Sequence, residues 1–146
     1  MSLEAINVKG YTTPRTFSGF QIPIPLQSMA IRRYCEDRGL VFNHHVVENI
    51  TPDTYFVLER ITREAHLYQA IAMCSVGMLP TDSQHRTALL SLCLDQDTSV
   101  HFLFEQTVVT SQSDIHAVNE LISLTNLVSG SPSRLGNFQY LSKYSS

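Results

Sequence analysis

The feature that most constrains this sequence is an alternation between short apolar, β-rich runs and longer segments with helical spacing. Strands are expected at Ile6–Tyr11, Leu40–Val47, Ala70–Cys74 and Val100–Phe104, and a helical pattern follows each of them. The run Ala70–Cys74 is continuously apolar, as a strand covered on both faces requires. The alternation predicts an α/β domain of three layers, in which helices cover both faces of a four-stranded, mostly parallel sheet. The strand order expected of a flavodoxin-like sheet of this size is 2-1-3-4. A flavodoxin-like sheet has this organisation.

Capping and proline signals predict where the helices begin. A proline in the first turn loses no hydrogen bond, and a Ser, Thr or Asp just before it satisfies a free backbone N–H group. Helices are therefore expected to begin near four points: Pro25, Thr51–Asp53, Asp82 or Ser83, and Ser111 or Ser113.

The length of 146 residues suits one domain with one core, which we place at residues 1–128. Residues 129–146 are rich in serine and form a C-terminal tail. Its aromatic residues Phe138, Tyr140 and Tyr144 suggest that the tail packs on the domain or on a partner, such as a second copy in a homo-oligomer.

Composition and charge indicate the cellular compartment of the protein and the classes of partner it can bind. Apolar runs reach only about six residues, so no segment is expected to span a membrane. The N-terminus lacks a leader pattern, and the three cysteines lack C-x-x-C pairing, which favours a reduced, cytoplasmic protein with buried thiols. The net charge of −3 makes nucleic acid an unlikely partner, because nucleic-acid binding depends largely on cationic contacts to phosphate.

Ligands of open parallel sheets bind beyond the carboxyl ends of the strands, where the strand order reverses. Seven polar residues follow the expected strands or face the same edge and form the candidate binding site: Thr12, Thr13, Arg15, Glu48, Ser75, Arg86 and Glu105. Arg15, in the Pro- and Gly-rich loop 12–25, either grips a phosphate or carboxylate or pairs with a glutamate to fix its loop. Arg86 either faces the same cleft or is a solvated helix residue.

The two glutamates also have two readings. Glu48 and Glu105 either share a cleft, where they orient a ligand, or serve as ion-pair partners of nearby arginines. Ser75, Thr12 and Thr13 are candidate hydroxyl nucleophiles, but no local motif supplies a base, so catalytic residues stay unassigned.

Several familiar motifs are absent from the sequence. It has neither the glycine-rich dinucleotide fingerprint nor a Walker A sequence, so no cofactor is predicted. His44 and His45 are adjacent on an expected strand and point to opposite faces, and no Cys/His cluster occurs, so no metal site is predicted.

Several short blocks together resemble the sporadic carbohydrate cluster proteins, a family encoded among surface-polysaccharide genes. The blocks are Gly10-Tyr11, Ile22-Pro23-x-Pro25-x-Gln27, Ile31-Arg32-x-Tyr34-Cys35 and Met78-Leu79-Pro80 with Arg86. The resemblance implies an accessory protein or enzyme of surface-carbohydrate biosynthesis that binds a sugar phosphate or sugar nucleotide.

A more distant likeness is to the catalytic domains of serine recombinases, the resolvases. It rests on the strand end at Tyr11, the helix that begins near Gln27, and the arginine-bearing segment after the third strand. No serine occupies the expected nucleophile position, and only one arginine lies in Met78–Arg86. This likeness implies a resolvase-like fold, and it leaves two alternative functions: a non-catalytic interaction module or a degenerate recombinase-like domain.

Overall fold

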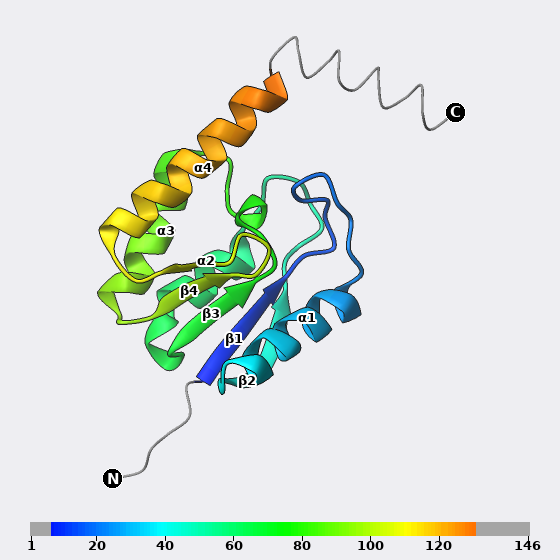
Figure 1. Ribbon diagram of the computed structural model, residues 1–146, viewed down its shortest axis with the longest axis vertical. Coiled ribbons are helices and arrows are strands. Elements are labelled where there is room, and N and C mark those ends of the chain that lie inside the picture. The colour runs from blue at the N-terminus through cyan, green and yellow to red at the C-terminus, as the bar shows by residue number, and fades with distance from the viewer. Residues whose placement is uncertain (1–6, 131–146) are drawn as a thin grey trace.

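In the computed structural model, which describes residues 7–130, strands and helices alternate along the chain (Figure 1). The elements follow in the order β1 (Asn7–Thr12), α1 (Ile24–Asp37), β2 (Val41–Val47), α2 (Phe56–Arg63), η1 (Ala65–Leu67), β3 (Ala70–Met73), η2 (Val76–Met78), α3 (Ser83–Asp95), β4 (Ser99–Phe102), β5 (Thr107–Val109) and α4 (Gln112–Gly130). The predicted tail lies outside the described residues from position 131 onward, so its packing on the domain or a partner stays a prediction.

The strands form one sheet in the order β2-β1-β3-β4-β5. The first four are parallel to one another, which confirms the predicted order and the predicted fold class. The prediction of four strands is corrected to five, because β5 returns antiparallel to β4. The two are joined by a tight turn in which Gln106 N donates to Leu103 O at 3.2 Å. A strand of three residues is too short to produce a periodic signal in the sequence.

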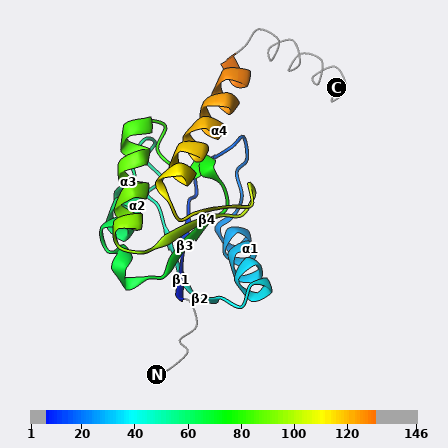
Figure 2. The same ribbon diagram turned by 60° about the vertical axis from the view of Figure 1, so that its left-hand side comes forward.

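Helices cover both faces of the sheet. Figure 2 shows α1 on one face and α2 and α3 on the other, while α4 packs on α3 and extends past the carboxyl ends of the strands. The larger core joins the sheet to α2, α3 and α4, and a smaller one lies beneath α1. All four residues of β3 are buried, as its continuous apolar run predicts.

Two helix starts illustrate where local signals succeed and fail. Asp82 caps α3 by accepting a hydrogen bond from His85 N, as its position predicts. The expected start at Thr51–Asp53 is wrong: these residues form a turn, Asp53 has φ 61°, and α2 begins at Phe56. A side chain from the end of β2 serves the N-terminus of α2 instead, as described below.

Gly10 is required where β1 and β2 approach closely. A Cβ atom at this position would lie 2.8 Å from the Phe42 ring, close to the point where β2 holds an extra residue between Phe42 and His45. Cys35, Cys74 and Cys93 are buried free thiols, as expected. Within residues 7–130, no helix is long and apolar enough to cross a membrane.

Candidate binding site at the carboxyl ends of the strands

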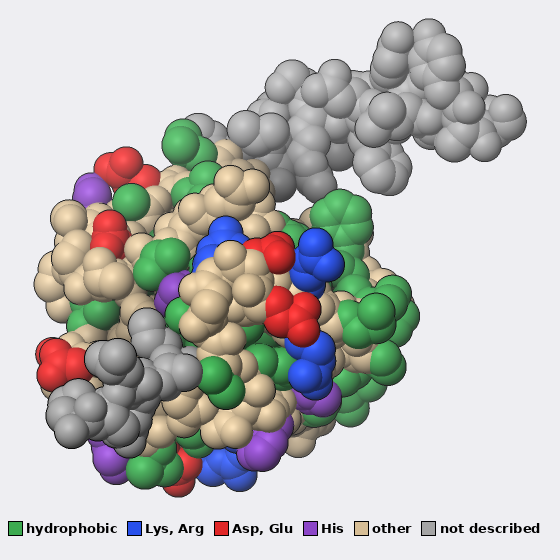
Figure 3. Space-filling view, turned by 60° about the horizontal axis from the view of Figure 1, so that its bottom comes forward, with side chains coloured by type: hydrophobic (Ala, Val, Ile, Leu, Met, Phe, Trp, Pro, Cys, Tyr) green, Lys and Arg blue, Asp and Glu red, His purple; other side chains and the backbone are tan. Residues whose placement is uncertain are grey.

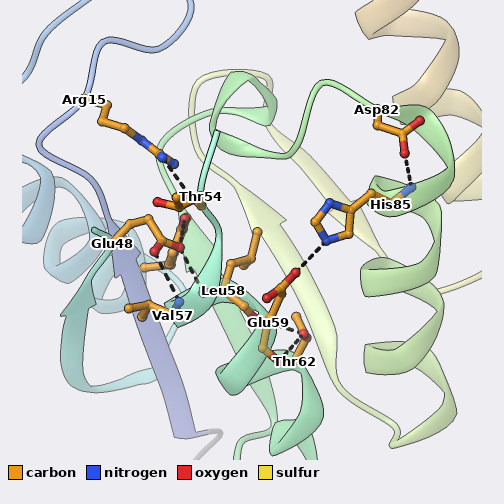
Figure 4. A network of polar contacts seen from close by, with 10 residues as sticks. Arg15, Glu48, Thr54, Val57, Leu58, Glu59, Thr62, Asp82 and His85 are labelled. Atoms are coloured by element: carbon orange, nitrogen blue, oxygen red, sulfur yellow. Dashed lines mark hydrogen bonds and ion pairs between the residues drawn. The ribbon is translucent and has the colours of Figure 1, made fainter. Parts of the chain in front are cut away.

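Glu48 is a structural carboxylate at the end of β2. It is 2% exposed, and its two oxygens accept four hydrogen bonds, of which Figure 4 shows those from Val57 and Leu58. Oε1 accepts from Tyr11 Oη at 2.8 Å and Leu58 N at 3.0 Å, and Oε2 accepts from Asn49 N at 2.9 Å and Val57 N at 3.2 Å. Two of these donors are free N–H groups of the first turn of α2, where a negative charge is favourable. Glu48 therefore replaces the local cap that the sequence predicted at Thr51–Asp53.

The tyrosine partner of Glu48 keeps its proton. Burial, followed by the negative charge of Glu48, raises the pKa of Tyr11 far above its ordinary value. Tyr11 is fully buried and donates to the carboxylate, so it fastens β1 to the end of β2.

Arg15 holds the loop that follows β2. Its Nη1 donates to Thr54 O at 2.7 Å (Figure 4) and to Thr51 O at 2.8 Å. Its guanidinium lies 4.8 Å from the centre of the Tyr55 ring. No ion pair joins Arg15 to Glu48 or Glu105 among the residues that the structure describes. Arg15 thus holds the loop after β2 by donating to backbone carbonyl oxygens, and not by the ion pair with a glutamate that the sequence analysis offered as one alternative.

The hydroxyl groups of Thr12 and Thr13 form hydrogen bonds with backbone groups. Thr12 Oγ1 donates to Val46 O at 2.8 Å, and Thr13 Oγ1 accepts from Arg15 N at 3.2 Å. Gln27, which the site prediction omitted, bonds both backbone groups of Thr13: its Oε1 accepts from Thr13 N at 3.1 Å and its Nε2 donates to Thr13 O at 2.7 Å. The sequence signal that could have identified Gln27 is that it is a polar residue on the buried, otherwise apolar face of α1.

A histidine and a glutamate join α2 to α3. His85 Nε2 lies 2.9 Å from Glu59 Oε2 (Figure 4). The His85 ring also meets the Tyr55 ring edge-on. Both side chains of the pair are about one-third exposed, so the contact is a minor source of stability.

Ser75 and Glu105 lie together on the other side of the strand ends. Ser75 Oγ donates to Glu105 Oε2 at 2.7 Å, and Val76 N donates to Glu105 Oε1 at 3.1 Å. Ser18, from the loop after β1, lies with its Oγ 2.7 Å from Ser75 Oγ. Three loops, after β1, β3 and β4, therefore meet at one hydroxyl–carboxylate cluster.

This meeting depends on Gly77. A Cβ atom at Gly77 would lie 2.1 Å from Ser18 Oγ and 3.0 Å from Ser18 N. Ser18 itself adopts φ 52°, a conformation that non-glycine residues rarely take.

Arg86 is a buried cation in the first half of α3. Its side chain is 2% exposed; Nε donates to Asn119 Oδ1 at 2.7 Å, and Nη1 donates to Pro80 O at 3.0 Å and Thr81 O at 3.2 Å. Burial lowers the pKa of Arg86, although the nearby Asp82 acts in the opposite direction. Within residues 7–130, the guanidinium forms no ion pair with a carboxylate.

A cavity of about 470 Å³ lies beside Arg86 and the Ser18 cluster. Its polar lining consists of Ser18, Thr81, Arg86, Glu105, Thr125 and Asn126, and its apolar lining comes from η2, the turn after it, and α4. Its size suits a small organic ligand. Of the seven predicted site residues, Arg86 and Glu105 line this cavity, and Ser75 supports it from behind. Thr12, Thr13, Arg15 and Glu48 lie in the network between β1, β2 and α2.

Solved structures place the fold among the catalytic domains of serine recombinases. The N-terminal catalytic domain of TP901-1 integrase is 14% identical with a TM-score of 0.62, and the alignment covers 84% of this chain and 95% of that domain. A resolvase family site-specific recombinase from Streptococcus pneumoniae is 10% identical with a TM-score of 0.62, covering 93% of this chain and 98% of that one. The C-terminal catalytic domain of ISC1926 TnpA, an IS607-like serine recombinase, is 13% identical with a TM-score of 0.56, covering 95% and 98%.

At these identities the comparison establishes a shared resolvase-like fold and no shared activity. No protein-family model matches the chain, and no curated protein matches it. The recombinase likeness expected from the sequence is therefore confirmed at the level of fold, and the resemblance to the sporadic carbohydrate cluster family has no support from these comparisons.

Proposed function

We propose that this chain is a degenerate serine-recombinase-like domain that binds a small phosphate-bearing ligand in the cavity beside Arg86. The observation that carries the proposal is a buried guanidinium that lines a cavity and has no carboxylate partner among the described residues. Removing a charge from water is costly, so buried cations are normally paired. A ligand phosphate would supply the missing negative charge through charge-assisted hydrogen bonds.

The position of the cavity supports the same proposal. It lies at the carboxyl ends of β1, β3 and β4, and the chain order reverses between β1 and β3. Open α/β sheets bind their ligands at this place. The proposal moves the anion contact from Arg15, whose Nη1 is held by two carbonyl oxygens, to Arg86.

The test is isothermal titration of the full chain with inorganic phosphate and with methyl phosphate. Arg86→Gln should weaken binding at least tenfold, and circular dichroism would check that the variant is folded. Arg15→Ala is the matched control, since it removes the other arginine at the strand ends and should leave the affinity within twofold. Unchanged affinity in folded Arg86→Gln would refute the assignment, and a loss confined to Arg15→Ala would place the anion site at Arg15.

The fold also favours a second candidate, action on DNA. Against it stand the net charge of −3 and the mixture of acidic and basic side chains on the face shown in Figure 3, which forms no continuous basic field. DNA binding driven by phosphate contacts would weaken steeply with salt. We expect no mobility shift of a duplex at low salt, and a salt-sensitive shift would favour this second function.

A further inference from the structure

The direction of the hydrogen bonds around Ser75 can be worked out by counting hydrogens. A serine hydroxyl has one hydrogen to donate and two lone pairs that accept. Ser75 Oγ donates its hydrogen to the Glu105 carboxylate, which only accepts, and it also accepts from Gly77 N at 3.1 Å. One lone pair of Ser75 is left, so the 2.7 Å contact with Ser18 has Ser18 as its donor.

Ser18 therefore presents acceptors alone to the cavity. Its only hydrogen is committed to Ser75, and its lone pairs remain for a ligand. Glu105 also lines the cavity, and each of its oxygens accepts one hydrogen bond from the protein, which leaves a further lone pair on each. The side chains of Ser18 and Glu105 in this corner thus accept hydrogen bonds from a ligand and donate none.

The cluster is held in this arrangement by its surroundings. Ser75 is fully buried, and Ser18 Oγ occupies the space that a Cβ of residue 77 would fill. The backbone N–H of Gly77 keeps one lone pair of Ser75 occupied. If Ser18 stopped donating, the two hydroxyl oxygens would face each other at 2.7 Å with no hydrogen between them, because the only hydrogen of Ser75 is directed at Glu105.

The cavity is therefore polarised. Arg86 offers donors and a positive charge on one part of its wall, and Ser18 with Glu105 offers acceptors on another. Resting on the phosphate-binding function above, we propose that the cavity selects phosphate esters of polyhydroxy compounds, such as sugar or polyol phosphates, whose hydroxyl groups donate to Ser18 and Glu105 while the phosphate meets Arg86. A phosphate ester without hydroxyl groups leaves the acceptor corner unmatched once water is displaced, and such unpaired polar groups cost binding affinity.

The experiment compares glycerol 3-phosphate with propyl phosphate, which has a similar length but no hydroxyl group, by isothermal titration of the full chain. We expect glycerol 3-phosphate to bind at least tenfold more tightly. Ser75→Ala frees the Ser18 hydrogen to point into the cavity, so this preference should fall below threefold while the affinity for propyl phosphate stays within twofold. Ser83→Ala, an exposed serine at the start of α3, is the matched control and should keep the full preference.

The outcomes separate this inference from the proposed function. Equal binding of the two esters by the wild-type chain overturns the selection for hydroxyl groups and leaves phosphate binding intact. A preference that survives unchanged in folded Ser75→Ala overturns the assigned direction of the hydrogen bonds. Binding of neither ester refutes the proposed function itself.

Discussion

Replacing Glu48 by glutamine tests the claim that this carboxylate is structural. The amide has one acceptor oxygen and one NH₂ group, whereas Glu48 receives four hydrogen bonds on two oxygens. In the better orientation the NH₂ group replaces Oε1, and Tyr11 reverses its role and accepts from it. The N–H of Leu58 then has no partner, because it meets another donor.

The cost follows from these contacts. An unsatisfied buried donor costs about 1–3 kcal/mol, and loss of the negative charge at the start of α2 adds about 0.3–1 kcal/mol. The two bonds that remain on the amide oxygen are no longer charge-assisted, so we expect a loss of about 3 kcal/mol of unfolding free energy in total. For a domain of this size the melting temperature should fall by roughly 10 °C.

Urea unfolding followed by circular dichroism would measure this loss. Glu36→Gln is the matched control, because Glu36 is exposed and its side chain has no hydrogen bond among the described residues; its effect should stay within about 0.5 kcal/mol. A decrease in unfolding free energy of less than about 1 kcal/mol for Glu48→Gln would refute the reasoning, and Glu48 would again be a candidate ligand-binding residue.

Three further predictions follow from single contacts. Gly77→Ala should lower the unfolding free energy in urea by about 2 kcal/mol, since its Cβ would collide with Ser18; Ser18→Gly added to it should restore most of the loss, and no restoration would show that another contact is responsible. Burial raises the pKa of Cys74 to about 11 and of Cys93 to about 12, so the folded chain keeps protons that the unfolded chain releases above about pH 9. Stability should therefore fall as the pH rises from 9 to 11, and replacing both cysteines by alanine should flatten part of that fall in urea titrations; an identical slope would contradict this. Arg15→Ala should cost about 1–2 kcal/mol and speed proteolysis between residues 49 and 55, because Thr51 and Thr54 lose their donor; unaltered cleavage would show that the loop is held by other contacts.

The sequence by itself determined the fold class. Local periodicity and the rule that consecutive parallel strands need a helical crossover predict a parallel α/β sheet without tertiary contacts. Several strand orders satisfy these signals, so the order of the first four strands was expected from the flavodoxin-like arrangement and is confirmed by the structure. The cap at Asp82 was also predictable, since its acceptor and donor lie three residues apart.

Only the tertiary structure decided which of the predicted polar residues line the cavity and which belong to the hydrogen-bond network between β1, β2 and α2. Both glutamates were expected at the ends of parallel strands. Glu48 directly follows β2 and accepts from the N-terminus of α2, whereas Glu105 lies in the turn between β4 and β5 and accepts from Ser75. Each carboxylate accepts from the donors that its own neighbouring loops bring near. Ser18 was not predicted as a site residue, since its partner Ser75 is 57 positions away and no local pattern marks the pair. The periodicity of apolar residues predicts which face of a helix or strand is buried. Hydrogen bonds between loops that are far apart in the sequence depend on the distance between those loops in the folded chain, and local sequence patterns do not encode that distance.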